Sequence, residues 1–463
     1  MSLKKKLEGL KFYNELVRPY HFAQALASGV KFGFPGRKLR VIGVTGTNGK
    51  TTTCFMIWKM LNESGHKTGL MTTVAWGVKR LEPELNHMTT VDSRTLNSRI
   101  RKIKDQGAEF LVLETTSHAL EQFRTLGIPV EIAVFTNLTH EHLDYHKTFE
   151  NYRKAKCKLF KKARFGVINA DDKSSKAFMK VSKDYVTYGI KNGKIRAKDV
   201  KLSVSGVKYS VGDIKIETNI PGEFNVYNSL AAVAVGEHLG LENEEISKGI
   251  AALDSVEGRM NRLDEGQDFS VIVDYAHTPD ALEKVFAAIG EVKGRIISVH
   301  GGAGRRDETT RSERGEILGK NSDFVIITED DSRDEDPEKI AHMFVEGAEK
   351  AGKTMGKDLA VNLDREEAIR AAIRLAKKND LVLILGKGHE KSILRKDGPV
   401  DFEDIKVARK YLKEKIKEAE LRREKEEHLR KLREEQLRKE AEKKRREEER
   451  RRKEEDVYGN ITE

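Results

Sequence analysis

The feature that most constrains this chain is a glycine-rich turn near its start, formed by Gly46, Thr47, Asn48, Gly49, Lys50, Thr51 and Thr52. The β-branched run at residues 41–44 before it is typical of a buried strand, and the apolar periodicity of residues 51–64 after it predicts a helix. Such a turn presents backbone N–H groups and a helix N-terminus to phosphate oxygens. Lys50 is placed to neutralise phosphate charge and the Thr51 hydroxyl to reach Mg²⁺. The turn therefore predicts a nucleotide-phosphate site.

Strand-like runs continue along the chain, most of them separated by helical stretches. They lie at residues 110–113, 132–135, 166–168, 271–273, 296–299, 324–327 and 381–385. This alternation predicts α/β architecture with parallel sheets and crossover helices. We expect a P-loop domain with a parallel sheet at residues 41–258 and a Rossmann-like α/β domain at residues 259–407. A short basic segment, residues 1–40, precedes them.

Charge and cysteine content exclude some function classes. The net charge of +11 is concentrated at the ends, with +7 on residues 1–40 and +3 on residues 411–456, so the body is nearly neutral. A nucleic-acid-binding body would carry its basic stripe on the folded domains, so no nucleic-acid partner is expected. The only two cysteines, Cys54 and Cys157, exclude a disulfide framework and fit a reducing, cytoplasmic location.

The last stretch, residues 408–463, is dominated by Glu, Lys and Arg. Several Glu residues precede a Lys or Arg by four positions, among them Glu427 before Lys431 and Glu435 before Lys439. That order favours an isolated helix, so we predict a long, charged, solvated helix. The alternative is a frayed, disordered tail, since highly charged segments often stay unfolded. The sequence indicates no partner for this tail.

Seven further short motifs follow the turn along the chain. They occupy residues 114–120 (ETTSHAL), 135–144 (FTNLTHEHLD), 152–160 (YRKAKCKLF), 222–228 (GEFNVYN), 258–260 (GRM), 274–279 (DYAHTP) and 386–390 (GKGHE). Together with the GTNGKTT turn, this series resembles the Mur ligases, relatives of the folylpolyglutamate synthases, over about residues 41–407. It is most similar to the branch that adds the third residue of the peptidoglycan stem peptide.

The resemblance implies an ATP-dependent amide ligase. In that reaction ATP phosphorylates a substrate carboxylate, and an amino group displaces phosphate from the acyl phosphate. The expected substrates are UDP-N-acetylmuramoyl-L-Ala-D-Glu, a nucleotide-sugar peptide, and a diamino acid, meso-diaminopimelate or lysine. We favour diaminopimelate, because Arg333 would pair with its second carboxylate.

The resemblance also implies catalytic roles for Lys50, Glu114, His142 and Lys156. By residue type alone, Glu114 and Thr51 suit Mg²⁺, which prefers oxygen ligands. By resemblance, His142 is a further ligand, and Lys156 is carbamylated by CO₂ so that it can hold a second Mg²⁺. Sequence pattern alone would instead favour a surface salt bridge for Lys156 and a hydrogen-bonding role for His142.

Three further groups of site residues follow from the resemblance. Nucleotide contacts are expected from the turn itself and from Asn228, Arg259, Asp274 and His277. Contacts to the nucleotide-sugar peptide are expected from Thr89, Thr90, Thr116, Ser117, Gln122 and Arg124. The incoming amino acid is expected to meet Asp330, Asp331, Arg333, Gly386 and Glu390. Asp331 and Ser332 depart from the family's D-N-P-R, in which Asn and Pro stand at these positions.

The front of the chain departs from the family more strongly. Only some forty residues precede the turn, where Mur ligases carry a domain that grips the UDP group, so either the carrier is bound differently or it is not a UDP-sugar. The basic, aromatic residues 1–40 also suggest peripheral contact with an anionic membrane surface. The alternative is a helix whose apolar side chains pack on the P-loop domain: Phe12, Leu16, Tyr20 and Phe22.

Two other functions remain open from the sequence. One is a related amide ligase, folylpolyglutamate-synthase-like or acting on a non-UDP carrier. The other is a non-catalytic nucleotide-binding scaffold that recruits partners through its tail.

Overall fold

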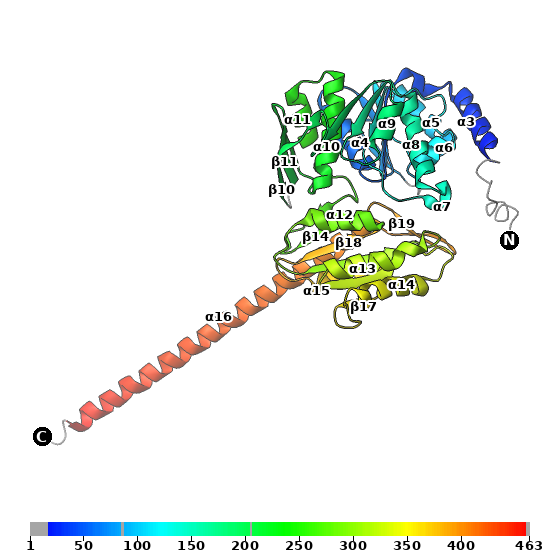
Figure 1. Cartoon of the computed structure of the whole chain (residues 1–463). Coiled ribbons are helices and arrows are strands. Elements are labelled where there is room, and N and C mark those ends of the chain that lie inside the picture. The colour runs from blue at the N-terminus through cyan, green and yellow to red at the C-terminus, as the bar shows by residue number, and fades with distance from the viewer. Residues whose placement is uncertain (1–16, 85–87, 204–205, 460–463) are drawn as a thin grey trace.

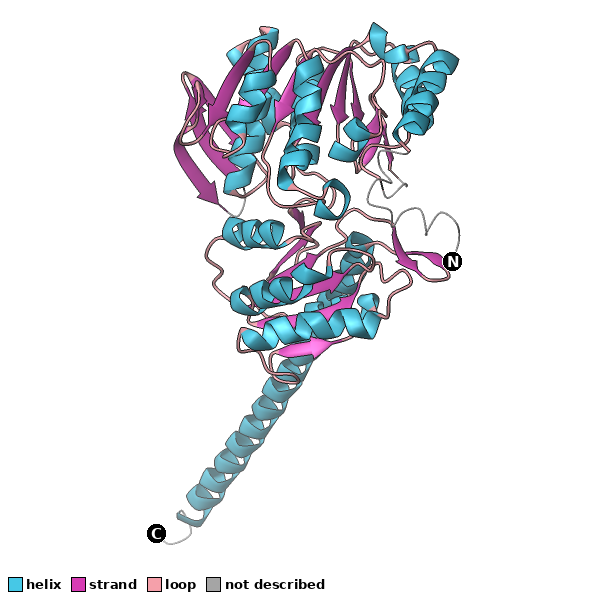
Figure 2. Ribbon diagram, turned by 45° about the vertical axis from the view of Figure 1, so that its right-hand side comes forward, coloured by secondary structure: helices cyan, strands magenta, loops and turns pink. Residues whose placement is uncertain are grey.

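The computed structural model describes residues 17–84, 88–203 and 206–459. Two bodies built of sheets and helices lie one above the other, and a long helix projects from the lower one (Figure 1). Turning the molecule shows that helices cover the faces of both main sheets (Figure 2). The predicted α/β architecture is confirmed. The domain boundary placed after residue 258 stays a prediction.

The upper body is built on a nine-stranded sheet in the order β4-β3-β2-β5-β1-β6-β7-β8-β9. Its strands are β1 (Arg40–Thr45), β2 (Thr68–Met71), β3 (Ala75–Gly77), β4 (Leu81–Pro83), β5 (Phe110–Glu114), β6 (Ile132–Phe135), β7 (Phe165–Asn169), β8 (Tyr185–Gly189) and β9 (Ile195–Arg196). The strand before the glycine-rich turn, β1, pairs in parallel with β5 and β6. Carboxyl ends of parallel neighbours meet at one edge, so β1 and β5 bring the turn and Glu114 together.

Helices and a small second sheet complete the upper body. They are α3 (Arg18–Phe32), η1 (Pro35–Lys38), α4 (Lys50–Glu63), α5 (Ser93–Asp105), α6 (Ser117–Glu121), α7 (Leu143–His146), α8 (Phe149–Lys162), α9 (Ser175–Val181), α10 (Glu223–Leu239), α11 (Asn243–Ala251) and the antiparallel strands β10 (Lys198–Ser203), β11 (Gly206–Val211) and β12 (Ile214–Thr218). The sequence did not predict the antiparallel edge strands β3 and β4 or the three-stranded sheet.

The lower body is a six-stranded sheet in the order β13-β14-β18-β15-β16-β17. Its elements are β13 (Asn261–Leu263), β14 (Ser270–Asp274), α12 (Pro279–Ile289), β15 (Ile296–Gly302), η2 (Glu308–Thr310), α13 (Arg311–Asn321), β16 (Phe324–Glu329), α14 (Pro337–Lys350), β17 (Leu359–Val361), α15 (Arg365–Leu375), β18 (Leu381–Leu385) and the hairpin β19 (Ser392–Arg395) and β20 (Gly398–Asp401). All strands except β13 run parallel in this sheet.

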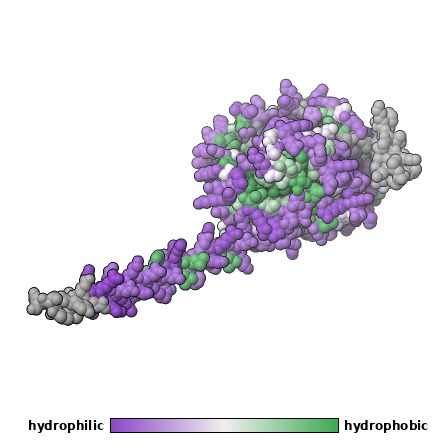
Figure 3. Space-filling view, turned by 90° about the horizontal axis from the view of Figure 1, so that it is seen from below, coloured by the Kyte–Doolittle hydropathy of each residue, from purple (hydrophilic) through white to green (hydrophobic). Residues whose placement is uncertain are grey.

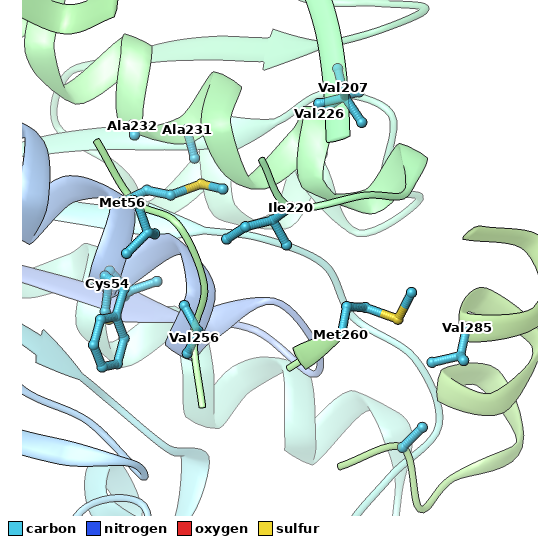
Figure 4. Close-up of a cluster of buried hydrophobic side chains, with 14 of the residues drawn as sticks. Cys54, Met56, Val207, Ile220, Val226, Ala231, Ala232, Val256, Met260 and Val285 are labelled. Carbon is cyan, nitrogen blue, oxygen red and sulfur yellow. The ribbon is translucent and has the colours of Figure 1, made fainter. Parts of the chain in front are cut away.

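The main hydrophobic core includes the contact between α10 and α4. Ala231 and Ala232 of α10 lie close to Met56 of α4 in the close-up (Figure 4), and all three are fully buried. The small side chains let the two helices approach, and burial of a side chain such as Met56 contributes about 1.5–3 kcal/mol. Because α4 starts at the phosphate turn, this packing fixes the turn against the sheet.

The charged C-terminal helix predicted from the sequence is confirmed. It is α16, Asp404–Gly459, and it begins four residues before the predicted start at 408. Its first turns are anchored in the lower body by Ala408 and Leu412, both fully buried. Residues 417–453 are exposed, and Figure 3 shows a mostly hydrophilic rod with scattered apolar side chains. Ion pairs four residues apart, such as Glu427–Lys431 at 2.8 Å, stabilise it by a few tenths of a kcal/mol each.

Candidate active site

A cavity of about 740 Å³ lies between the two bodies and is lined by side chains of both. The predicted residues that line it are Thr47, Asn48, Gly49, Lys50, Thr51, Thr52, Thr89, Glu114, Thr116, His142, Asn228, Arg259, Asp274, His277, Asp330, Asp331, Arg333, Gly386 and Glu390. Six predicted residues lie outside this lining: Gly46, Thr90, Ser117, Gln122, Arg124 and Lys156. The structure thus brings residues from both halves of the chain around one space.

The phosphate turn is shaped by close backbone packing. Gly49 has a φ of 81° at the N-cap of α4, and a Cβ atom there would overlap the Asn228 side chain, so glycine is required. Asn228 also accepts a hydrogen bond from the Thr53 hydroxyl at 3.2 Å. The Lys50 ammonium donates to the carbonyl of Thr47 at 2.7 Å, so it curls back over the turn. This is the geometry of a phosphate cradle.

Glu114, at the end of β5, is the centre of a group of oxygen atoms. One of its carboxylate oxygens accepts hydrogen bonds from the Thr51 hydroxyl at 3.0 Å and from the backbone N–H and hydroxyl of Thr73, both at 2.9 Å. The carboxylate is only 1 % exposed. A buried anion beside a hydroxyl at the mouth of a phosphate turn fits Mg²⁺, which prefers such hard oxygen ligands.

Lys156 lies behind the phosphate turn. Its Nζ atom donates to the carbonyl of Gly46 at 2.7 Å and sits 4.6 Å above the centre of the Tyr152 ring. Burial, reinforced by the nearby Lys50, lowers the pKa of the Lys156 amine well below its usual value. The surface salt bridge that the sequence pattern favoured is therefore wrong, because Lys156 is 2 % exposed.

His142 borders the same region. Its backbone adopts the left-handed conformation, with a φ of 57°, at the start of α7. Burial, together with Lys156 and Lys50, lowers the pKa of His142 to about 2, so the imidazole is neutral at physiological pH. A neutral imidazole has a lone pair available for a metal ion.

The lower body sends three predicted residues toward the phosphate turn. Arg259 donates to the Thr51 hydroxyl at 3.5 Å and stacks 4.6 Å from the Tyr275 ring centre. Asp274 accepts backbone hydrogen bonds from Met260 at 2.6 Å and Ala276 at 2.8 Å, so it shapes the loop that carries Arg259. A third residue, His277, lines the cavity nearby.

The residues predicted for the nucleotide-sugar peptide form a linked polar chain beside the cavity. The Thr116 hydroxyl donates to the Thr90 hydroxyl at 3.3 Å, and Arg124 donates to the Thr90 carbonyl and, at 2.6 Å, to Gln122. The Ser117 hydroxyl instead pairs with the buried His146 at 2.9 Å. Of this chain, Thr116 reaches the cavity together with Thr89.

The residues predicted for the amino acid surround a buried lysine. Lys387 donates to Asp331 and Glu390 at 2.8 Å each, and to Asp330 at 3.3 Å. Burial alone would lower the pKa of Lys387, but the three carboxylates raise it above its usual value. Burial alone would also raise the pKa of Asp330, but Lys387 and Arg365 hold it below its usual value. Lys387 and Asp330 are therefore held charged, whereas burial raises the pKa of Asp331 above its usual value.

Arg333 stands apart from that group at the cavity lining. Its φ of 56° is unusual for a residue with a side chain, and its backbone N–H is held by the carbonyl of Leu394 in β19 at 2.8 Å. Backbone strain of this kind persists where the surrounding structure enforces it, often at ligand sites. The loop that replaces the family's D-N-P-R thus still directs an arginine to the cavity.

Lys387, Arg306 and Thr73 are among the residues of this site that the sequence did not predict. Lys387 lies inside the GKGHE motif, but nothing in its spacing indicated three carboxylate partners. Arg306 lines the cavity from the loop after β15. Thr73 supplies two of the hydrogen bonds to Glu114 and belongs to no motif, so no sequence signal marked it.

Comparison with known proteins supports the resemblance. The family model described as the Mur ligase middle domain matches residues 44–236, and that described as the Mur ligase, glutamate ligase domain matches residues 258–388. The chain is 40 % identical over 407 residues to a UDP-N-acetylmuramoyl-L-alanyl-D-glutamate–2,6-diaminopimelate ligase of Syntrophomonas wolfei, covering 85 % of this chain and 82 % of that protein. It is 38 % identical over 408 residues to a UDP-N-acetylmuramyl-tripeptide synthetase of Roseiflexus, covering 83 % and 80 %.

A solved structure agrees with these relatives. A UDP-N-acetylmuramoyl-L-alanyl-D-glutamate–2,6-diaminopimelate ligase superposes with a TM-score of 0.58 at 31 % identity, covering 81 % of this chain and 79 % of that one. The two family models together span more than half of the sequence and both bodies that form the cavity. This chain therefore belongs to the Mur ligase family.

Proposed function

We propose that this chain adds meso-diaminopimelate to UDP-N-acetylmuramoyl-L-alanyl-D-glutamate in peptidoglycan synthesis, using ATP. As a Mur ligase it is an ADP-forming amide ligase. The observation that carries the proposal is the shared cavity, where the phosphate turn of one body faces the charged Asp330–Asp331–Lys387–Glu390 group of the other. Phosphate release measured with this peptide carrier and candidate amino acids tests it.

The chemistry assigned to the site is mainly positioning and charge stabilisation. The turn and Lys50 hold the phosphates of ATP, and Arg259 brings a second cation to the γ-phosphate from the lower body. The substrate carboxylate attacks the γ-phosphorus and ADP leaves, which gives an acyl phosphate. The amine of the amino acid then attacks the acyl carbon and releases phosphate. Mg²⁺, which Thr51, Glu114 and His142 would hold, supplies positive charge to the phosphate oxygens.

We also propose that Lys156 carries a carbamate. Its amine is buried near the Lys50 ammonium, and its hydrogen bond goes to a neutral carbonyl rather than to a carboxylate. The neutral amine, which the lowered pKa favours, would attack CO₂, form an N–C bond and release one proton, leaving an anion beside Lys50. That anion would offset the positive charge of Lys50 and offer oxygen atoms to a second Mg²⁺.

Diaminopimelate is favoured over lysine because of the arrangement of charges. The distal end of diaminopimelate carries both an ammonium and a carboxylate, and the site offers Asp331 and Glu390 for the first and Arg333 for the second. Asp331, which replaces the family's Asn, is already paired with Lys387 at 2.8 Å. Lys387 also pairs with Asp330 and Glu390, so the three carboxylates leave negative charge for the distal ammonium, and Arg333 is left for the distal carboxylate.

Replacing Arg333 with alanine is expected to lower kcat/KM for diaminopimelate by about ten- to a hundredfold, the value of a lost charge-assisted hydrogen bond. Activity with lysine should change little, since lysine has no distal carboxylate. Initial rates with both amino acids measure this. Arg395→Ala is the matched control, because Arg395 is tied to Glu329 at 2.6 Å and does not line the cavity. Unchanged diaminopimelate use by Arg333→Ala would contradict the assignment.

A separate observation favours peripheral membrane contact through α3. No helix in the described part of the chain is long and apolar enough to cross a membrane. On α3, however, the side chains of Tyr20, Phe22, Leu26 and Val30 are 43–65 % exposed. The packed alternative is wrong for Tyr20, whereas Phe22 keeps an edge-to-face contact with Phe123, with 5.5 Å between the ring centres. Phe12 and Leu16 lie outside the described residues. Residues 17–39 contain four basic and no acidic residues, which suits anionic lipid. We propose that the protein is a cytoplasmic enzyme that binds anionic membrane surfaces peripherally through α3.

Replacing Leu26 and Val30 with glutamine is expected to reduce co-sedimentation with anionic phospholipid vesicles at low salt by about tenfold, since each loses apolar area that would enter the interface. Val361→Gln is the control, because Val361 is similarly exposed on β17 of the lower body. If the wild-type protein ignores these vesicles, or if both variants lose binding equally, the membrane contact is refuted.

A further inference from the structure

Arg365, the first residue of α15, is 1 % exposed and holds together parts of the lower body that lie far apart in the sequence. On one side its guanidinium makes two hydrogen bonds to the carboxylate of Asp404, at 2.7 and 2.8 Å. On the other side it donates to the carbonyl of Glu329 at 3.2 Å and to the carbonyl of Leu385 at 3.1 Å. One planar group therefore joins α15, the start of α16 and two strand ends.

The two carbonyl acceptors show which loops the Arg365 guanidinium holds in place. Glu329 is the last residue of β16 and Leu385 the last residue of β18, and β15 separates these strands in the sheet. The next residues along the chain are Asp330 and Asp331 after β16, and Gly386 and Lys387 after β18. We infer that the Arg365–Asp404 pair is a positioning device for the amino-acid pocket, an inference that rests on the proposed function.

The consequence of losing the pair is geometric. Lys387 lies 2.8 Å from both Asp331 and Glu390 and offsets part of their negative charge, and these residues lie on two different loops. Arg365 holds the two strand ends from which these loops start. A displacement of about 1 Å at a binding site costs up to 10²-fold in catalytic efficiency. The phosphate turn lies in the other body, and only Arg259, Asp274 and His277 of the predicted nucleotide contacts belong to the lower one, so KM for ATP should change less than KM for diaminopimelate.

A second pair of the same kind provides a matched control. Arg295 is joined to the buried carboxylate of Asp380 at 2.7 Å. Asp380 also accepts from the Arg295 backbone N–H at 2.8 Å. These residues directly precede β15 and β18, so they hold the amino ends of the strands, at the edge of the sheet opposite to the pocket. Both pairs stabilise the same sheet, but only one touches the pocket loops.

The test compares three full-length variants with the wild type: Arg365→Lys, Asp404→Asn and Asp380→Asn. For the first two, KM for diaminopimelate should rise about tenfold or more while KM for ATP stays within about twofold. Arg365→Lys keeps the charge but loses the planar fork that holds two carbonyls and a carboxylate together, so it should not restore KM. Asp380→Asn should lower Tm less, because the Arg295 side chain is 40 % exposed, and should leave both KM values unchanged.

Two results would overturn the inference: equal KM shifts in Asp404→Asn and Asp380→Asn, or an unchanged KM for diaminopimelate in Arg365→Lys and Asp404→Asn. Failure of the proposed function looks different, because the wild type itself would then release no phosphate with diaminopimelate. In that case crystal structures of Asp404→Asn and Asp380→Asn decide. The spacing of Asp331, Lys387 and Glu390 should change only in the first, and unchanged spacing in both would refute the positioning role.

Discussion

Replacing Lys50 with alanine is expected to lower the rate of amide formation by about 10²-fold or more. The Lys50 ammonium lies over the phosphate turn, where it would meet phosphate oxygens whose charge increases during transfer. An interaction that is strongest in the transition state lowers kcat when it is lost, with a smaller effect on binding of ATP. Steady-state phosphate release and direct binding of ATP, measured on the same preparation, separate the two effects.

The matched control is Lys59→Ala on the same helix, α4. Lys59 forms a surface ion pair with Glu63 at 2.7 Å, away from the cavity lining. Its removal should leave turnover unchanged. Near-wild-type turnover by the Lys50 variant would remove the basis for treating the glycine-rich turn as the catalytic phosphate site.

The second large effect is expected at Lys156. Lys156→Ala should be almost inactive, because it removes both the proposed carbamate and the ligand that this would offer to a second Mg²⁺. Added short carboxylates such as acetate should restore part of the activity, since they fit the space vacated by the side chain and supply the missing anion. Turnover at increasing carboxylate concentration measures the recovery.

Lys158→Ala is the control for this experiment. Lys158 lies on the same helix and forms an ion pair with Glu121 at 2.6 Å in a half-buried position. This variant should keep its activity and show no response to carboxylates. A crystal equilibrated with CO₂ and nucleotide that showed an unmodified amine on Lys156 would argue strongly against the carbamate.

Local sequence patterns were sufficient for much of the fold. The β-branched run before Gly46 and the apolar periodicity after it correctly predicted β1 and α4, and the run at residues 381–385 correctly predicted β18. The strand β10 was missed because its residues are mostly exposed and show no alternation, and β12 was missed although buried and exposed residues alternate along it. The place of this three-stranded sheet is determined by packing against α10, a tertiary contact that local patterning does not encode.

The site residues fall into the same two classes, those that local motifs predict and those that depend on tertiary contacts. Residues that act through the backbone turn or a strand end, such as Lys50 and Glu114, stand in motifs whose spacing is local. Lys387 and Arg365 act through partners on other loops, and Arg365 meets Asp404 across 39 residues of sequence. Such roles arise only when separate strands end side by side. A single sequence shows which residue types are present but not which of them come into contact in the folded protein.

The exposed length of α16 also determines how the whole molecule moves. Residues 417–453 alone extend about 55 Å at 1.5 Å per residue, whereas a folded body of some 400 residues has a radius of gyration of about 21 Å. The particle is therefore club-shaped, with a frictional coefficient well above that of a sphere of equal mass and with rotation about its long axis much faster than end-over-end tumbling. A group attached to the far end of α16 would therefore move with the whole helix, which is anchored in the lower body by its buried start at Asp404.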